Sequence, residues 1–208
     1  DYNIGRNIFY TPRGTERYSF DDLRLVARQS ELVRLAIETR MDQISAIKWQ
    51  IKPIMENKGE DQDDDPRIKE ISDFLAMPDK IHDWDQWLRM ILEELFVTDA
   101  VSLARRKTRG GSLYALEPID GSTIFPLIDG DGRQPMPPDP AFQQILKGVP
   151  KANYTSDELI YYVRKTQVNT PYGFSPVEQI IARDENNYIA LNVHYARDRK
   201  STRLNSSH

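Results

Sequence analysis

The spacing of hydrophobic positions predicts helices at the start of the chain. Ser19-Phe-Asp-Asp22 has the form of a capping box, and the apolar positions after it recur every three or four residues up to Ile44, as in a helix with one buried face. From Ile47 to Ile51 apolar side chains alternate with lysine and glutamine, which predicts a half-buried strand ended by Pro53. Residues 1–55 are therefore expected to form a helical segment followed by a first strand.

An acidic segment separates this part from the rest of the chain. Residues 56–66 are rich in carboxylates and have no aliphatic or aromatic side chain, so we expect a mobile loop. Asp61, Asp63, Asp64 and Asp65 could hold a cation, but we favour a solvated linker. Asp65-Pro66 is typical of a helix start, and a second helix is expected from about Asp83. The apolar stripe of that second helix predicts a central place in the core.

The pattern of residues 101–197 predicts strands and then a final helix. The expected strands are Val101–Arg106 and Ser112–Glu117, which Gly110-Gly111 joins as a hairpin, then Thr123–Ile128 and Glu158–Lys165. A short helix is expected at Phe142–Leu146 and a last one from Pro176 into the 190s. Helices precede strands without regular alternation, so the fold class is α+β with a small mixed or antiparallel sheet. Residues 67–197 are expected to form this α+β region.

Composition excludes several classes of protein. Asp198–His208 matches the translation of a widely used sequencing adapter, so we leave it out of the prediction; the remainder carries a net charge of about −6, from 28 − 3 basic and 32 − 1 acidic residues. This acidity does not favour a large nucleic-acid-binding face. The absence of cysteine excludes disulfides and thiolate metal sites, and no apolar run approaches the ~20 residues of a membrane-spanning helix.

Gly173-Phe-Ser-Pro-Val177 lies between a strand and a helix, where a serine-hydrolase nucleophile could sit. Pro176 argues against this reading, because the residue after the nucleophile must donate its N–H to the oxyanion hole and proline has none. The same residues predict a rigid corner: Ser175 as the N-cap, Pro176 at the first helical position, and Glu178 completing a capping box. Gly173 is expected to provide the freedom for a tight turn.

Two further groups could carry chemistry. Arg105, Arg106, Lys107 and Arg109 form a basic cluster at the hairpin tip, which an acidic partner or DNA could reach; we favour an exposed turn, because no aromatic side chains are interleaved. Asp129-Gly-Asp-Gly132 begins like a calcium loop, but Pro140 occupies the position of the bidentate glutamate. A β-turn is therefore predicted. No cofactor or catalytic residue set is expected.

Several stretches together resemble the portal proteins of tailed bacteriophages. The strongest are Asp157–Arg164 (DELIYYVR) and Thr170–Ile180 (TPYGFSPVEQI), and the order of Leu32–Ile51, Trp84–Ala100 and Leu116–Ile124 agrees with that family. The resemblance covers nearly all of residues 20–197. The signature residues are Trp49, Asp157, Glu158, Tyr161, Tyr172, Gly173, Ser175, Pro176 and Glu178.

The resemblance implies a structural subunit and not an enzyme. It implies the wing portion of a portal subunit, truncated before the stem, whose complete form builds a dodecameric ring at one capsid vertex of the virion. Such a ring contacts the terminase motor, the capsid and the neck proteins, and passes double-stranded DNA during packaging and ejection, without a membrane. A metal-dependent phage nuclease and a DNA-binding adaptor remain as alternatives.

Overall fold

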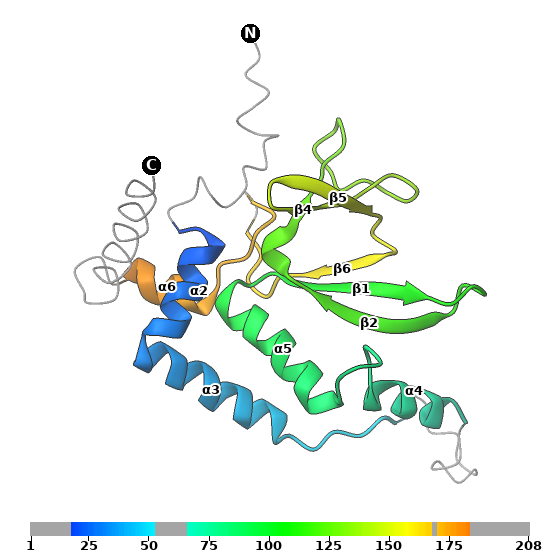
Figure 1. Cartoon of the computed structure of the whole chain (residues 1–208), viewed down its shortest axis with the longest axis horizontal. Coiled ribbons are helices and arrows are strands. Elements are labelled where there is room, and N and C mark those ends of the chain that lie inside the picture. The colour runs from blue at the N-terminus through cyan, green and yellow to red at the C-terminus, as the bar shows by residue number, and fades with distance from the viewer. Residues whose placement is uncertain (1–17, 53–65, 168–169, 184–208) are drawn as a thin grey trace, which may run out of the picture.

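The computed structural model describes residues 18–52, 66–167 and 170–183, which form helices and two small antiparallel sheets (Figure 1). The α+β class is thus confirmed. The helices are α2 (Phe20–Gln29), α3 (Glu31–Ser45), α4 (Pro66–Ala76), α5 (Trp84–Val97) and α6 (Pro176–Arg183). The strands are β1 (Val101–Lys107), β2 (Leu113–Ile119), β3 (Ile124–Pro126), β4 (Phe142–Leu146), β5 (Val149–Tyr154) and β6 (Leu159–Tyr162), with a short 3-10 turn at Gly121–Thr123.

Several expectations fall on residues outside these ranges. They are the acidic loop up to Asp65, the continuation of the last helix beyond Arg183, and the segment 198–208. No helix within the described ranges is both long and apolar enough to cross a membrane.

The first helical pattern belongs to two helices and not to one. Ser19 caps α2 as predicted: its Oγ accepts the N–H of Asp22 at 3.2 Å, and its own N–H donates to the Asp22 carboxylate at 2.9 Å. Ser30 then adopts an extended conformation, ends α2 and caps α3. The apolar spacing continues through this break because both helices bury one face in the same core.

The strand expected at Ile47–Ile51 was wrong. These residues follow α3 without pairing to either sheet. The Trp49 ring lies 4.9 Å from the Trp84 ring at the start of α5, while Ile47 is 62% exposed. The alternating pattern therefore reflects contact of one aromatic side chain with a helix and not a strand in a sheet.

Each sheet has three strands. In the first, β1 lies between β2 and β6; in the second, β4 lies between β3 and β5. The predicted β1–β2 hairpin is confirmed, with Leu103 opposite Pro118 and a bulge between Arg106 and Lys107. The strands predicted at 123–128 and 158–165 are present but shorter, since the 3-10 turn precedes β3 and β6 ends at Tyr162.

The helix expected at Phe142–Leu146 was also wrong, because these residues form β4, the central strand of the second sheet. Strand β5, which the sequence pattern did not reveal, pairs with it through a two-residue turn. Both turn residues, Lys147 and Gly148, have positive φ angles of 52° and 75°. Tight hairpins of the I′ type require this geometry, and it fixes the pairing of β4 with β5.

Three contiguous cores connect these layers. The largest joins α2, α3, α5 and α6. A second packs the other face of α5 on the first sheet through Trp87, Val101 and Leu103. The third lies between the two sheets around Phe142 and Leu159. Helix α5 is thus the centre of the fold, as its apolar stripe predicted, and its C-terminal part packs against α2 and α6.

Candidate functional site

The predicted strand-to-helix corner contains the N-cap of α6. The Ser175 hydroxyl accepts the N–H of Glu178 at 3.0 Å, and the Ser175 carbonyl accepts the first helical bond from Gln179 at 2.9 Å. Pro176 is the first residue of α6, where its missing N–H costs nothing. Ser175 is fully buried. Its hydroxyl therefore serves the helix and is not exposed as a nucleophile would be.

A buried carboxylate, Asp99, holds this corner against the end of α5. Its Oδ1 accepts the N–H of Arg164 at 2.7 Å and its Oδ2 accepts that of Lys165 at 3.0 Å. Its own N–H donates to the Glu94 carbonyl at 3.0 Å, and its φ of 52° places it in the left-handed region that ends a helix. Asp99 thus connects α5 to the segment between β6 and α6. No local sequence pattern marks Asp99 for this role.

Gly173 is required for a reason other than the one predicted. Its φ angle is not positive, so the turn does not need glycine for conformational freedom. A Cβ at this position would instead overlap the Asp99 side chain, since the three nearest atoms all belong to that side chain and lie closer than 3.0 Å. Glycine is present because the Asp99 carboxylate packs directly against the backbone.

The remaining signature residues occupy different parts of the fold. Tyr172 is buried beside the corner, with its ring edge-on to Phe20 of α2 at 5.9 Å. Tyr161 stacks on Phe142 at 5.7 Å and joins the two sheets. The others lie away from the corner: Trp49 at the opposite end of α5, and Asp157 with Glu158 on the exposed β5–β6 turn.

The Glu158 side chain has a structural role in that turn. Its carboxylate accepts the N–H and the hydroxyl of Thr155 at 3.0 and 3.1 Å. Its carbonyl accepts the N–H of Arg105 at 2.8 Å, which extends the pairing of β6 with β1. Glu158 therefore fixes the start of β6, although both Glu158 and Asp157 are exposed.

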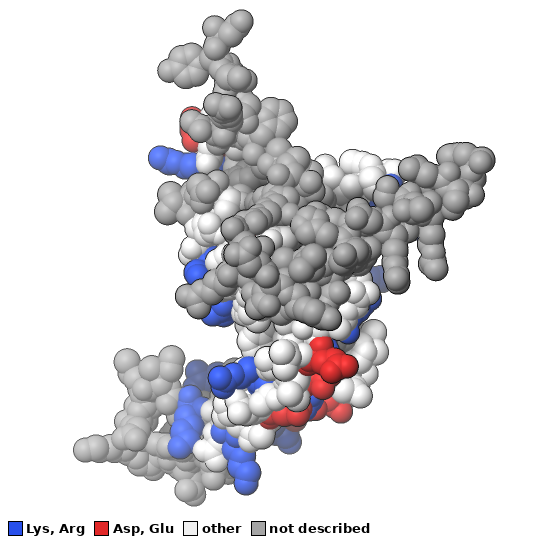
Figure 2. Space-filling model, turned by 90° about the vertical axis from the view of Figure 1, so that its left-hand side faces the viewer, with Lys and Arg blue, Asp and Glu red and all other residues white. Residues whose placement is uncertain are grey.

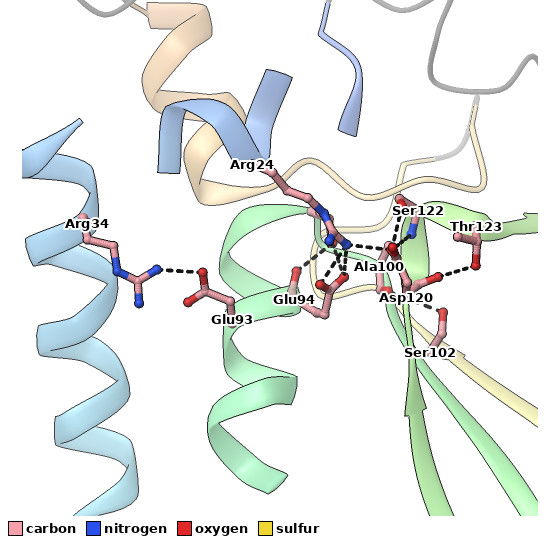
Figure 3. A network of polar contacts seen from close by, with 10 residues as sticks. Arg24, Arg34, Glu93, Glu94, Ala100, Ser102, Asp120, Ser122 and Thr123 are labelled. Atoms are coloured by element: carbon pink, nitrogen blue, oxygen red, sulfur yellow. Dashed lines mark hydrogen bonds and ion pairs between the residues drawn. The ribbon is translucent and has the colours of Figure 1, made fainter. Parts of the chain in front are cut away.

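An ion network beside the corner joins α2, α5 and the turn after β2 (Figure 3). Arg24 Nη2 contacts the Glu94 carboxylate at 2.9 Å and Asp120 Oδ1 at 2.7 Å. Asp120 also accepts the N–H and the hydroxyl of Ser122, at 2.9 and 2.6 Å. One guanidinium thus holds together two carboxylates from segments far apart in the sequence.

Burial raises the pKa of the Glu94 carboxyl above its ordinary value, and the nearby Asp120 carboxylate acts in the same direction. Arg24 and the hydrogen bonds from Thr98 and the Gly121 N–H offset part of this effect. Gly121 can lie this close only without a side chain, because a Cβ there would overlap the Ala100 carbonyl. Glu94 is therefore a group whose charge depends on its partner Arg24.

A second buried carboxylate, Asp79, organises the connection between α4 and α5. Its Oδ1 accepts the N–H groups of Ile81 and His82 at 2.9 and 2.7 Å, and its Oδ2 lies 2.6 Å from His82 Nδ1. Burial alone would raise the pKa of Asp79, but these hydrogen bonds outweigh it and lower the pKa below its ordinary value. Asp79 thus remains ionised and serves as an acceptor for the turn.

The fold matches solved structures over most of the chain. One matching chain belongs to the neck of an empty gene transfer agent particle computed with C6 symmetry: its TM-score is 0.62 with 15% identity, over 90% of this chain and 47% of that one. Another belongs to the virion of a native gene transfer agent particle, with a TM-score of 0.59 and 14% identity over 90% of this chain.

This chain shares its fold with chains of gene transfer agent particles. It spans about half the length of those chains, 47% and 46% respectively. No known protein family matches the sequence, and no curated protein matches it. At 14–15% identity the likeness establishes the fold.

Within the described ranges, no group of three or more histidine or carboxylate side chains could hold a metal ion. The acidic residues Asp61 to Asp65 lie outside those ranges. At Asp129 the predicted β-turn is confirmed: the Asp129 carboxylate accepts the N–H groups of Asp131 and Arg133 at 2.9 and 2.8 Å. Gly132 has the positive φ of 78° that the turn needs.

The basic cluster lies where it was predicted, at the β1–β2 end of the first sheet. Arg106 pairs with Glu117 across the hairpin. Arg105, Lys107 and Arg109 form no ion pair with any other residue in the described part of the chain. The cluster is remote from the corner, because β1 runs from the α5 end of the fold to the hairpin tip (Figure 1).

Proposed function

We propose that this chain is a structural subunit of a phage-like particle, and specifically a wing-like portion of a portal-type ring subunit. The shared fold over 90% of the chain carries this proposal, because both matched chains belong to gene transfer agent particles. The ordered resemblance to portal sequences, from Leu32 to Ile180, supports the finer assignment. The role is assembly at a particle vertex and not catalysis.

The internal structure is consistent with such a role. The buried carboxylate Asp99 and the Arg24 network both connect secondary structure elements, and neither places a titratable group at an open cleft. In a ring, small changes in subunit shape accumulate around the symmetry axis, so rigid connections between elements favour closure. In the complete protein we propose a dodecameric ring in the virion, which receives terminase, capsid and neck proteins and passes double-stranded DNA.

Self-association tests this proposal. The complete protein, expressed from its natural coding sequence, should form closed oligomers of one size in sedimentation velocity over a concentration series, and negative-stain electron microscopy should show rings. The natural coding sequence that surrounds residues 1–197 should also encode a long stem helix followed by a small domain. A natural sequence without a stem, together with a strictly monomeric chain, would refute the portal assignment.

The enzyme alternative has a direct test. Calorimetric titration with Mg²⁺ or Mn²⁺ should show no tight stoichiometric binding. Tight binding that is abolished by Asp63→Asn with Asp64→Asn would instead favour a metal-dependent nuclease, because hard cations require clustered carboxylates.

A further inference from the structure

The cations at the β1–β2 tip differ from Arg34 and Arg89 on the helical side of the molecule. Figure 2 shows Lys and Arg side chains on that side next to a patch of Asp and Glu. There Arg34 pairs with Glu93 and Arg89 pairs with Asp42, both at 2.7 Å. The three tip cations Arg105, Lys107 and Arg109 have no such partners in the described ranges. Their charge is therefore available to a partner.

The tip is shaped as a projecting two-stranded ribbon (Figure 1). The turn closes through the bond from the Thr108 N–H to the Ser112 carbonyl at 2.8 Å, with Gly111 at a φ of 87°. A Cβ on Gly111 would meet no atom within 4 Å, so the space around the turn is open. Lys107 and Arg109 are exposed, and Arg105 is half-buried. A partner can thus approach the ribbon from its end.

The chemistry of the tip favours phosphates over a protein surface. Residues 105–112 contain no carboxylate and no aliphatic or aromatic side chain, only cations, hydroxyls and glycines. A protein interface usually centres on buried apolar or aromatic side chains. Residues 105–112 offer none, and the nearest are Leu113 and Tyr114 at the start of β2, which are 47% and 53% exposed. Phosphate oxygens require only cations and hydroxyl or N–H donors.

We propose that the β1–β2 ribbon binds the backbone of double-stranded DNA, independently of base sequence, through Arg105, Lys107 and Arg109. A two-stranded ribbon is narrow enough for the major groove, which is about 12 Å wide. Thr108 and Ser112 provide hydroxyl groups beside these cations. This contact does not depend on ring formation. A monomer that binds DNA would support the ribbon and contradict the ring, and a ring that does not bind DNA would do the opposite.

The salt dependence of DNA binding tests the proposal. Anisotropy of a fluorescent duplex is titrated with the full chain at several salt concentrations. Three phosphate contacts predict a slope of log K against log salt of about −2.7, and Lys107→Gln with Arg109→Gln should reduce it to about −0.9. Adding Arg105→Gln should remove measurable binding. Circular dichroism checks folding, and the double variant remains decisive if the triple variant unfolds, since Lys107 and Arg109 are exposed.

A matched control removes the same charge elsewhere. Arg133, Lys147 and Lys151 are exposed on other turns and strands, and their triple glutamine variant should keep wild-type binding and slope. Equal losses in both triple variants would overturn the proposal, because net charge alone would then explain binding. Absence of wild-type binding at low salt would also overturn it. If poly-glutamate binds as tightly as the duplex and the ribbon substitutions abolish this binding, the ligand is an acidic protein and the DNA proposal is overturned.

Discussion

Asp99 and Gly173 can be tested as one unit through a double-mutant cycle. Asp99→Gly removes the carboxylate and keeps a residue that tolerates the φ of 52°. It deletes two hydrogen bonds to a charged acceptor, from the N–H groups of Arg164 and Lys165. Each is worth about 1.5–3 kcal/mol, and water recovers part of this at a part-buried site, so we expect a loss of about 2–4 kcal/mol.

Gly173→Ala should cost about 1–3 kcal/mol, because its Cβ would overlap the Asp99 side chain. In the Asp99→Gly background the overlapping atoms are gone, and the cost of Gly173→Ala should fall to near zero. The two changes should therefore be coupled by about 1–3 kcal/mol. Gly130→Ala provides the control: a Cβ there meets no atom within 4 Å, so it should be neutral or slightly stabilising in both backgrounds.

Urea denaturation followed by circular dichroism gives the free energy of unfolding of each variant by linear extrapolation. Tryptophan fluorescence adds a probe at the far end of α5, where Trp49, Trp84 and Trp87 stack. If the costs of Asp99→Gly and Gly173→Ala add within about 0.5 kcal/mol, the close contact between these two residues is not the reason for glycine at position 173.

Four other outcomes are expected. Ser175→Ala should lower the free energy of unfolding by about 1 kcal/mol through loss of the N-cap, measured by thermal unfolding; an unchanged melting temperature would contradict the corner. Arg24→Met should destabilise the fold more at neutral than at acid pH, because Glu94 and Asp120 then face each other without a cation. Since the pKa of Glu94 is raised, the wild type should gain stability as pH falls from that raised value towards about 4.3, and Glu94→Gln should abolish this gain in urea titrations across pH. The lowered pKa of Asp79 stabilises the fold above its unfolded value of about 3.9, and this stability is lost as pH falls through the folded value; Asp79→Asn should remove that part of the acid transition.

Local signals in the sequence were sufficient for the helices and for one hairpin. Ser19 caps α2 as predicted, because a capping side chain acts within three residues of its own position. Helix α5 begins where it was expected, and the structure shows that Asp83 is its N-cap. Gly110-Gly111 predicted the β1–β2 turn, which is likewise a local feature of the chain. Such signals require no knowledge of distant segments.

Short apolar runs were ambiguous. Phe142, Ile145 and Leu146 have helical spacing, but five residues are too few to separate a helix from a strand, and pairing with β3 and β5 decided the outcome. Lys147-Gly148 was the available turn signal, although it is weaker than Asn-Gly. Pro150 obscured β5, and a proline is acceptable there because β5 is an edge strand.

Asp99 and the Arg24 network could not have been found from sequence. Asp99 is bound by backbone N–H groups 65 and 66 residues away, and Arg24 meets carboxylates 70 and 96 residues away. Backbone N–H donors have no sequence signature. In the sequence, an aspartate just after a helix therefore looks the same whether it is buried and hydrogen-bonded or exposed to solvent. The sequence pattern singled out Gly173, but it did not indicate that Asp99 packs against this glycine.

The position of α6 follows from contacts that converge on it from three segments. Ser175 sets where the helix begins, Asp99 holds the preceding strand end against α5, and Tyr172 places the corner against Phe20 of α2. Val177 and Ile181 then bury its first two turns in the same core as α2 and α5. These contacts come from three different segments, so together they fix both the position and the direction of α6. The G-F-S-P-V motif and the buried carboxylate of Asp99, just after the end of α5, therefore orient α6 together, and only the motif is recognisable in the sequence.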